Sequence, residues 1–299
     1  MTSRFDPGLR ARVEALGSAL TPELLTRSQG IYAPLQRPIS PGELIIEREL
    51  AYGGNERQRL DVLRQQADAL RPALVFVHGG GFVGGEKTRP GLPFYENVAV
   101  WAARAGLVGV NMTYRLAPAH PWPAGAEDVS AALAFLVRHA QDHGIDPHRI
   151  WVAGQSAGAA HVASAFALGL AREAAGAILI SGLYELTIAD PRAISQAYYG
   201  SDPAAFEARS SAKGVAASNR PVLIAAAEND PRHFQQQSLA LANAIFDVRR
   251  SLPRFITMAG HNHITGILHL GLPGDRLGPE ILDVIETEKS KTDDGGRRQ

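Results

Sequence analysis

Short, continuously apolar segments alternate with longer amphipathic segments over most of this chain. Six of the apolar segments contain the residues expected of strands: "ALVFVHGGG", "LVGVNMTYR", "RIWVAGQ", "GAILISG", "PVLIAAAE" and "RFITMAG". The segments between them, such as "AEDVSAALAFLVRHAQDHG", carry apolar residues every three or four positions and indicate helices. Strands that are apolar on both faces and joined by helices form a parallel sheet covered on both sides. We therefore predict an α/β protein, in which "ELIIERELAYGG" and "QRLDVLRQ" bring the number of strands to about eight.

The 299 residues are predicted to form a single domain, because no linker rich in Pro, Gly or Ser interrupts them and one core can bury most of the surface of such a chain. Residues 1–42 are expected to be a helical cap segment, in which Asp6 and Thr21 are N-caps and each precedes a proline. Residues 183–219 interrupt the alternation and are predicted to be a cap insertion over one end of the sheet. The charged residues 287–299 are predicted to be a flexible tail.

Composition excludes several classes of function. The 30 basic residues balance the 30 acidic ones, so nothing favours binding to nucleic acid or to an anionic membrane surface. The chain has no cysteine, which removes disulfides, thiolate nucleophiles and cysteine metal sites. It has no apolar stretch long enough to span a membrane, and the charged start does not read as a signal peptide. A cytoplasmic protein is the expectation, with a homodimer retained as one option for its assembly.

The segment "IWVAGQSAGAAHVASAFA" changes from strand-forming to helix-forming residues at Ser156, which has Gly154 and Gly158 two positions away on either side. In open parallel sheets, ligands bind beyond the carboxyl ends of the strands. A tight strand-to-helix turn strains the serine backbone and lifts its hydroxyl into the open, and glycines avoid the clashes that side chains would cause there. The following helix directs unpaired N–H groups toward an oxyanion formed at the serine. The pattern predicts a nucleophile; a glycine-rich turn without chemistry is the simpler alternative.

A nucleophilic serine needs a base, and the base needs an acid that orients it. On this type of fold the chain order is serine, then acid, then histidine. The segment "PVLIAAAENDP" offers Glu228 and Asp230 at a strand end, and "RFITMAGHNH" offers His261 and His263. From the residues alone both choices stay open. A metal site at the H-x-H pair is a further alternative, although no acidic residue or other histidine has matching spacing.

The glycine-rich segment "LVFVHGGGFVGGEK" follows the third strand and suits an oxyanion site. Glycines let the backbone turn its N–H groups inward, where side chains would block an approaching carbonyl group. The predicted donors are the N–H groups of Gly80 and Gly81 from this loop and of Ala157, the residue after the serine. A phosphate-binding loop is the alternative reading, but no Gly-Lys-Ser/Thr sequence follows.

The segments "HGGGF", "YRLAPAHPWPAGAED" and "GQSAG" together resemble the hormone-sensitive-lipase-like branch of the α/β-hydrolases, and the group of kynurenine formamidases and small carboxylesterases is similarly close. The resemblance covers residues 44–282 and implies an α/β-hydrolase fold with a small helical cap. It also implies Asp230 as the acid, from its Glu-x-Asp-Pro context, and His263 as the base, because an apolar residue and a short helix follow it. Gln155 departs from the Asp or His that often precedes the serine in this family.

The resulting hypothesis is a serine carboxylesterase that acts on small to medium esters through an acyl-enzyme formed on Ser156. This chemistry requires neither metal nor organic cofactor, so none is predicted. Five residues are candidates for the substrate pocket: Ile31, Tyr32, Phe82, Tyr198 and Tyr199. His161, one turn beyond the serine, is expected to be a packing residue. The alternatives are an arylformamidase that uses the same three residues and a non-catalytic ligand receptor built on the same fold.

Overall fold

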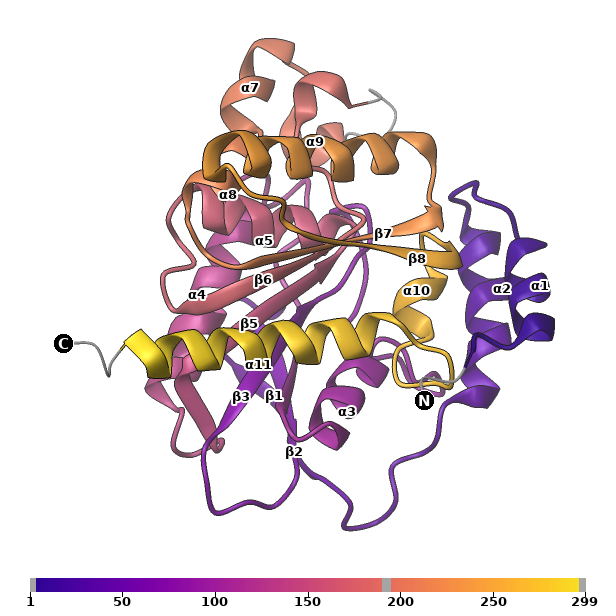
Figure 1. The fold of residues 1–299 in the computed structure, drawn as a ribbon, viewed down its shortest axis with the longest axis vertical. Coiled ribbons are helices and arrows are strands. Elements are labelled where there is room, and N and C mark those ends of the chain that lie inside the picture. The colour runs from indigo at the N-terminus through magenta and orange to yellow at the C-terminus, as the bar shows by residue number, and fades with distance from the viewer. Residues whose placement is uncertain (1–3, 190–194, 296–299) are drawn as a thin grey trace.

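A computed structural model describes residues 4–189 and 195–295 of the chain, and its centre is an eight-stranded sheet (Figure 1). The strands lie in the order β1-β2-β4-β3-β5-β6-β7-β8. The pairs β1–β2 and β2–β4 are antiparallel and the remaining pairs are parallel, which confirms the predicted, mostly parallel sheet. The strands are β1 (Ile45–Ala51), β2 (Arg59–Arg64), β3 (Arg71–Val77), β4 (Val108–Met112), β5 (Ile145–Gln155), β6 (Ala174–Ile180), β7 (Val222–Asn229) and β8 (Arg254–Asn262).

Helices cover both faces of the sheet. In Figure 1, α3 and α11 cross the near face, while α4, α5 and α8 lie behind the strands. The α-helices are α1 (Pro7–Glu14), α2 (Pro22–Tyr32), α3 (Glu96–Arg104), α4 (Ala124–Arg138), α5 (Ala157–Ala167), α6 (Gln196–Tyr199), α7 (Phe206–Arg209), α8 (Ala212–Ala217), α9 (Arg232–Arg249), α10 (Thr265–Leu268) and α11 (Leu277–Gly295). Short 3-10 helices are η1 (Ala33–Leu35), η2 (Leu186–Ile188) and η3 (Pro203–Ala205).

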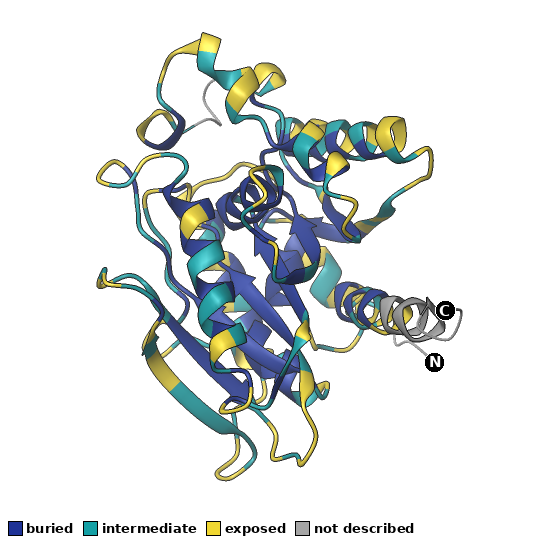
Figure 2. Ribbon diagram, turned by 90° about the vertical axis from the view of Figure 1, so that its left-hand side faces the viewer, coloured by how far each residue is buried: buried dark blue, intermediate teal, exposed yellow. Residues whose placement is uncertain are grey.

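The alternation of side chains along each strand divides the core into two halves. On β3, Leu74 and Phe76 pack with residues of α3 and α11, whereas Val75 and Val77 pack with residues of α4, α5 and α9. Both sets are almost completely buried, and Figure 2 shows the buried strands between helices whose outer surfaces are exposed. This two-sided burial explains why the central strands are apolar at every position.

The N-terminal segment forms the predicted helices, which lie beside the carboxyl ends of β7 and β8. The Asp6 carboxylate accepts a hydrogen bond of 2.7 Å from the Leu9 N–H, and the Thr21 hydroxyl accepts one of 3.1 Å from the Leu24 N–H. Both helices therefore begin as the capping signals predict. Helix α1 contacts β8 and α2 contacts α10, so the segment flanks the edge of the sheet where the candidate site lies (Figure 1).

The predicted cap insertion and the predicted tail both contain helices. The insertion predicted at residues 183–219 contains η2, α6, η3, α7 and α8, although residues 190–194 lie outside the described part. Residues from 287 onward, predicted to be a flexible tail, continue α11 as far as Gly295 instead, and residues 296–299 are outside the described part. The Glu and Lys residues of this stretch favour helix, and no proline ends it. Among the described helices, none is both long and apolar enough to cross a bilayer.

Candidate active site

Ser156 occupies the corner between β5 and α5 in a strained conformation. Its backbone φ of 56° and ψ of −120° lie in a region that residues other than glycine rarely adopt. The flanking glycines are required by space: a Cβ atom on Gly158 would lie 2.0 Å from the carbonyl oxygen of Val77, and one on Gly154 would lie 2.5 Å from the carbonyl carbon of Gly158. The serine hydroxyl is thereby presented at the carboxyl end of the sheet, as the motif predicts.

The structure joins Ser156, His263 and Asp230 in one chain of hydrogen bonds. The Nε2 atom of His263 lies 2.9 Å from Ser156 Oγ, and its Nδ1 atom lies 2.8 Å from Asp230 Oδ1. The other carboxylate oxygen, Oδ2, accepts hydrogen bonds of 2.5 Å from the Ser181 hydroxyl and 2.9 Å from the Ala227 N–H. An ionised carboxylate only accepts, so Nδ1 carries the ring proton and Nε2 is free to accept the proton of the serine.

The alternative acid, Glu228, lies away from the histidine. Its carboxylate accepts a hydrogen bond of 2.6 Å from the Gly260 N–H and lies 3.5 Å from the Arg10 guanidinium, and about half of its side chain is exposed. Asp230 is two residues further along, where its side chain is almost completely buried. Of the two carboxylates that the sequence offered as the acid, only that of Asp230 reaches His263.

The alternative base, His261, is also engaged elsewhere. Its Nδ1 atom lies 3.2 Å from Thr265 Oγ1, and its ring stacks on Phe5 with the centroids 4.7 Å apart. His261 and His263 thus have different partners. Among the described residues, no group of three or more histidine, cysteine or acidic side chains is placed to hold a metal ion.

Three backbone N–H groups are available beside the serine. Gly80 and Gly81 have φ values of 147° and 61°, and a Cβ atom on Gly80 would lie 2.0 Å from the carbonyl oxygen of Gly84. Neither glycine N–H donates to a described residue. Ala157 is the first residue of α5, a position whose N–H has no acceptor within the helix. The loop conformation is thus compatible with the predicted oxyanion site.

The loop rests on a buried group of aromatic and imidazole side chains. Tyr114 donates a hydrogen bond of 2.9 Å to the carbonyl oxygen of His78 and stacks on its ring, and His78 Nδ1 lies 2.7 Å from the carbonyl oxygen of Gly79. Burial lowers the pKa of His78 to about 3, so the ring is neutral and its Nδ1–H donates. The histidine and tyrosine of the two family segments therefore hold the glycine loop in place.

His161 packs under the site, as expected. Its Nδ1 atom lies 3.1 Å from the hydroxyl of Tyr198, and its ring meets Phe82 edge-on. Burial lowers the pKa of His161 to about 3. A Cβ atom on Gly125 would lie 2.1 Å from this ring, so α4 approaches α5 closely at this point.

Two further residues support the site without any strong signal in the sequence. Gln155 is almost fully buried, and its Nε2 atom donates a hydrogen bond of 2.9 Å to the carbonyl oxygen of His263. Ser181 follows β6 and holds Asp230, as described above. The sequence hints at the role of Ser181 only through its place just after β6. Because β6 and β7 are neighbouring parallel strands, the residues that follow them lie close together, and Asp230 follows β7.

The serine opens into a cavity of about 950 Å³. The N-terminal segment contributes residues 19–22 and Leu25 to its wall, and Phe234 and Ile264 add further apolar surface. None of the described residues that line it is Asp or Glu. Arg89 also lines the cavity, and its guanidinium makes no ion pair or hydrogen bond with a described residue. The described wall is therefore mostly apolar, and Arg89 adds a positive charge to it.

The predicted pocket residues lie in different places. Phe82 lines the cavity, but Ile31, Tyr32, Tyr198 and Tyr199 do not. Tyr32 is fully buried in the core cluster that also contains residues of α10 and α11, and Ile31 packs against this cluster. The two tyrosines of α6 are buried behind Phe82, whose ring stacks on Tyr198 at a centroid distance of 4.7 Å. The prediction was wrong for these four residues: Tyr198 and Tyr199 support the cavity from behind Phe82, and Ile31 and Tyr32 belong to another part of the core.

Ser156 lies in a strained strand-to-helix turn beside free backbone N–H groups, and it is hydrogen-bonded to a histidine that is in turn hydrogen-bonded to an aspartate. This arrangement defines a site of the serine-hydrolase type. A family described as "alpha/beta hydrolase fold" matches residues 74–258, and the chain belongs to this family. This match confirms the predicted resemblance and fold class.

Relatives in sequence include esterases and an arylacetamide deacetylase. The chain is 43% identical over 122 residues to the carboxylesterase NlhH of Mycobacterium tuberculosis, and 31% identical over 136 residues to the arylacetamide deacetylase of Bos taurus. These matches cover 40% and 44% of this chain, and they span 36% and 33% of the length of the two relatives. They thus relate part of this chain to about a third of each relative.

Solved structures of the same fold match almost the whole chain. Esterase B from Lactobacillus rhamnosis has a TM-score of 0.74 at 19% identity, with 98% of each chain covered. An esterase from Pyrobaculum calidifontis has a TM-score of 0.71 at 23% identity, covering 96% of this chain and 99% of that one. At these identities the likeness shows the fold alone.

Proposed function

We propose that this protein is a serine carboxylesterase that hydrolyses small to medium carboxylic esters through an acyl-enzyme. The observation that carries the proposal is the continuous hydrogen-bonded chain from Ser156 Oγ through both ring nitrogens of His263 to Asp230. The match to the carboxylesterase NlhH supports the same choice of substrate bond.

In the first half-reaction, Ser156 Oγ attacks the ester carbonyl carbon while His263 Nε2 accepts its proton. The carbonyl oxygen becomes an oxyanion, which the N–H groups of Gly80, Gly81 and Ala157 stabilise. Asp230 stabilises the imidazolium that forms and keeps its ring in place. His263 then gives the proton to the leaving alcohol, and the C–O bond breaks to leave the acyl group on the serine.

In the second half-reaction, water takes the place of the alcohol. His263 removes a proton from the water as it attacks the acyl carbon, and the second tetrahedral oxyanion forms at the same N–H groups. Collapse of this intermediate returns the proton to Ser156 and releases the carboxylic acid. The step restores the starting enzyme.

The cavity favours compact substrates. Its wall is mostly apolar, and helix α2 together with residues 19–22 limits it on one side. An acyl chain can therefore gain from apolar burial only until it reaches this wall. An N-formyl amide would meet the same nucleophile, so the arylformamidase reaction is tested beside ester hydrolysis. A cytoplasmic location and a homodimer both stay predictions from the sequence.

The decisive experiment compares the wild-type protein, Ser156→Ala and the control Ser201→Ala, whose serine is exposed on the cap insertion. We expect p-nitrophenyl acetate and butyrate to be hydrolysed by the wild type and the control, and at least about a thousandfold more slowly by Ser156→Ala. We also expect the rate to fall when the acyl chain exceeds medium length.

Three results would contradict the proposal. Undiminished hydrolysis by a folded Ser156→Ala variant would exclude this serine as nucleophile. If the wild type hydrolysed N-formylkynurenine but no ester, the site would be a formamidase. Absence both of hydrolysis and of labelling by a fluorophosphonate probe would favour a receptor.

A further inference from the structure

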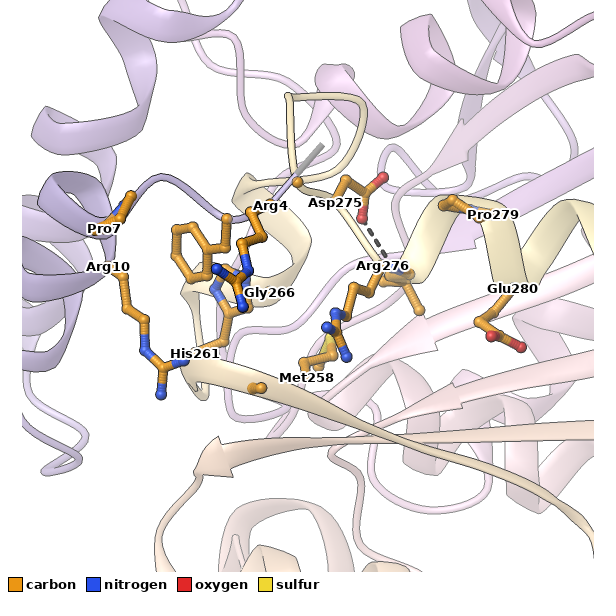
Figure 3. Close-up of a pocket in the computed structure, with 14 residues that line it drawn as sticks. Arg4, Pro7, Arg10, Met258, His261, Gly266, Asp275, Arg276, Pro279 and Glu280 are labelled. Carbon is orange, nitrogen blue, oxygen red and sulfur yellow. Dashed lines mark hydrogen bonds between the residues drawn. The ribbon is translucent and has the colours of Figure 1, made fainter. Parts of the chain in front are cut away.

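A second cavity, of about 740 Å³, lies between the N-terminal segment, the end of β8 and the start of α11 (Figure 3). None of the residues that line it also lines the cavity of Ser156. Its wall includes His261, the first histidine of the H-x-H pair, which the proposed hydrolysis does not use. The cavity is therefore a separate feature of the molecule.

Three arginines line this cavity. Figure 3 shows the Arg276 guanidinium near Met258, and the Arg4 and Arg10 side chains on the His261 side of the cavity. Arg10 is paired with two carboxylates, at 2.7 Å from Glu14 and 3.5 Å from Glu228. Arg4 and Arg276 form no ion pair or hydrogen bond with any residue in the described part of the chain. Two free positive charges thus face the same space.

His261 adds a buried donor to the same wall. It is 6% exposed, and its Nδ1 atom lies 3.2 Å from Thr265 Oγ1. That hydroxyl oxygen already accepts a hydrogen bond of 3.0 Å from the Asn262 N–H, so its own proton is available to Nδ1. The ring is neutral, because burial and then the nearby His269 and Arg10 lower the pKa of His261 to about 3. The ring proton therefore lies on Nε2, which has no acceptor among the described residues.

The two acidic residues of the cavity do not neutralise these donors. Asp275 accepts hydrogen bonds from the N–H groups of Gly271, Leu277 and Gly278, and so caps the start of α11. Figure 3 places Glu280 further along α11, beyond the Arg276 side chain. The free donors are thus gathered at one end of the cavity, and the acceptors there are already used.

Apolar side chains complete the wall beside the donors. Phe5, Met258 and Leu277 line the cavity, and Phe5 covers the His261 ring. Planar guanidinium groups bind carboxylates and phosphates through paired hydrogen bonds, and an apolar surface beside them accommodates an aliphatic body. The shape and the chemistry of the cavity therefore suit an amphiphilic anion.

We propose that this cavity is a binding site for an organic anion with one carboxylate or phosphate head and a short aliphatic chain. The head lies between Arg4 and Arg276 and accepts a hydrogen bond from His261 Nε2–H. The chain lies on Phe5 and Met258. The site does not depend on the proposed esterase activity, because it shares no lining residue with the catalytic cavity.

Isothermal titration calorimetry with octanoate, octyl phosphate and the neutral analogue octanol tests the proposal. We expect saturable 1:1 binding of at least one of the two anions, and binding of octanol at least about tenfold weaker. Arg4→Gln and Arg276→Gln should each weaken binding of that anion by about five- to tenfold, and the double variant by about thirtyfold or more. The difference between octanoate and octyl phosphate identifies the preferred head group.

Arg89→Gln is the matched control, because Arg89 is the free arginine of the catalytic cavity. It should leave the affinity for the anion within about twofold of wild type. His261→Phe keeps the stack on Phe5 and removes the donor, and we expect it to weaken binding by about threefold or more. The proposal is overturned if neither anion saturates below about 10 mM, if the double variant binds as tightly as wild type, or if Arg89→Gln abolishes binding.

Discussion

Replacement of Asp230 by Asn tests the central hydrogen-bonded chain most directly. The carboxylate oxygen Oδ2 accepts from the Ser181 hydroxyl and the Ala227 N–H, and Oδ1 accepts from His263 Nδ1. An asparagine has one oxygen, and the two donors at Oδ2 require it there. The amide NH₂ group must then face His263 and donate to Nδ1. The ring proton moves to Nε2, which can no longer accept the proton of the serine.

The size of the effect follows from the charge that is lost. An imidazolium and a carboxylate about 4 Å apart interact by about 4 kcal/mol at an effective dielectric constant of about 20. Loss of this term from the transition state corresponds to about a thousandfold in rate. The reversed tautomer adds to the loss, so we expect kcat to fall by about 10³ to 10⁴ with little change in KM.

The assay is p-nitrophenyl ester hydrolysis, with Glu228→Gln as the matched control. Glu228 is the other acidic residue at the same strand end, and its carboxylate bonds to the Gly260 N–H instead. The control should keep kcat within about threefold of wild type, because its side chain is half exposed and remote from the histidine. Retention of a tenth or more of kcat by a folded Asp230→Asn protein, or an equal loss in Glu228→Gln, would refute the reasoning.

Further predictions concern packing, pH and substrate charge. Gly158→Ala should cost about 1–3 kcal/mol of unfolding free energy or more and most of the activity, as measured by urea denaturation and ester hydrolysis, because the new Cβ would meet the backbone of β3. Burial lowers the pKa values of His78, His161 and His261 to about 3 in the folded protein. Below about pH 6.5 the unfolded chain therefore binds more protons than the folded one. The free energy of unfolding should fall there, as the pH is lowered, by about 1.4 kcal/mol per pH unit for each histidine. His161→Gln should reduce that slope by one such increment, and an unchanged slope between about pH 4 and 6 would count against a neutral buried ring. Arg89→Gln should raise KM for mono-p-nitrophenyl glutarate by about five- to tenfold and leave KM for p-nitrophenyl valerate within about twofold; equal effects on both esters would exclude an anion contact.

The fold was predictable because its signals are local and repeated. Each of the eight strands overlaps a segment that the apolar pattern identified, although β5 begins four residues before its segment. Strand β3 shows why the pattern works: its alternate residues are buried on opposite faces of the sheet. The course of α11 beyond residue 287 was not predictable in this way. A charged stretch with almost no apolar residue suits both a solvated helix and a tail, and composition does not distinguish them.

The candidate site also contains residues that the sequence predicts and residues that it does not. Ser156, Asp230 and His263 follow strands, and the parallel sheet brings such ends to one edge. The choice between His261 and His263 needed the family segments, because both lie where β8 ends and both are buried. The pocket residues failed for a different reason. Aromatic residues near a site are as useful for supporting it as for lining it, and only packing decides which way Tyr198 and Tyr199 face.

Gln155 illustrates how a departure from a motif can suit its own surroundings. The residue is almost fully buried beside the nucleophile, and its amide donates to the carbonyl oxygen of His263. An ionised carboxylate at this position has no proton to donate and would place a second negative charge near the histidine. The neutral amide instead holds the backbone of His263 while Asp230 holds its ring. The base is thus fixed at two points, and Asp230 is the carboxylate that bonds to the imidazole.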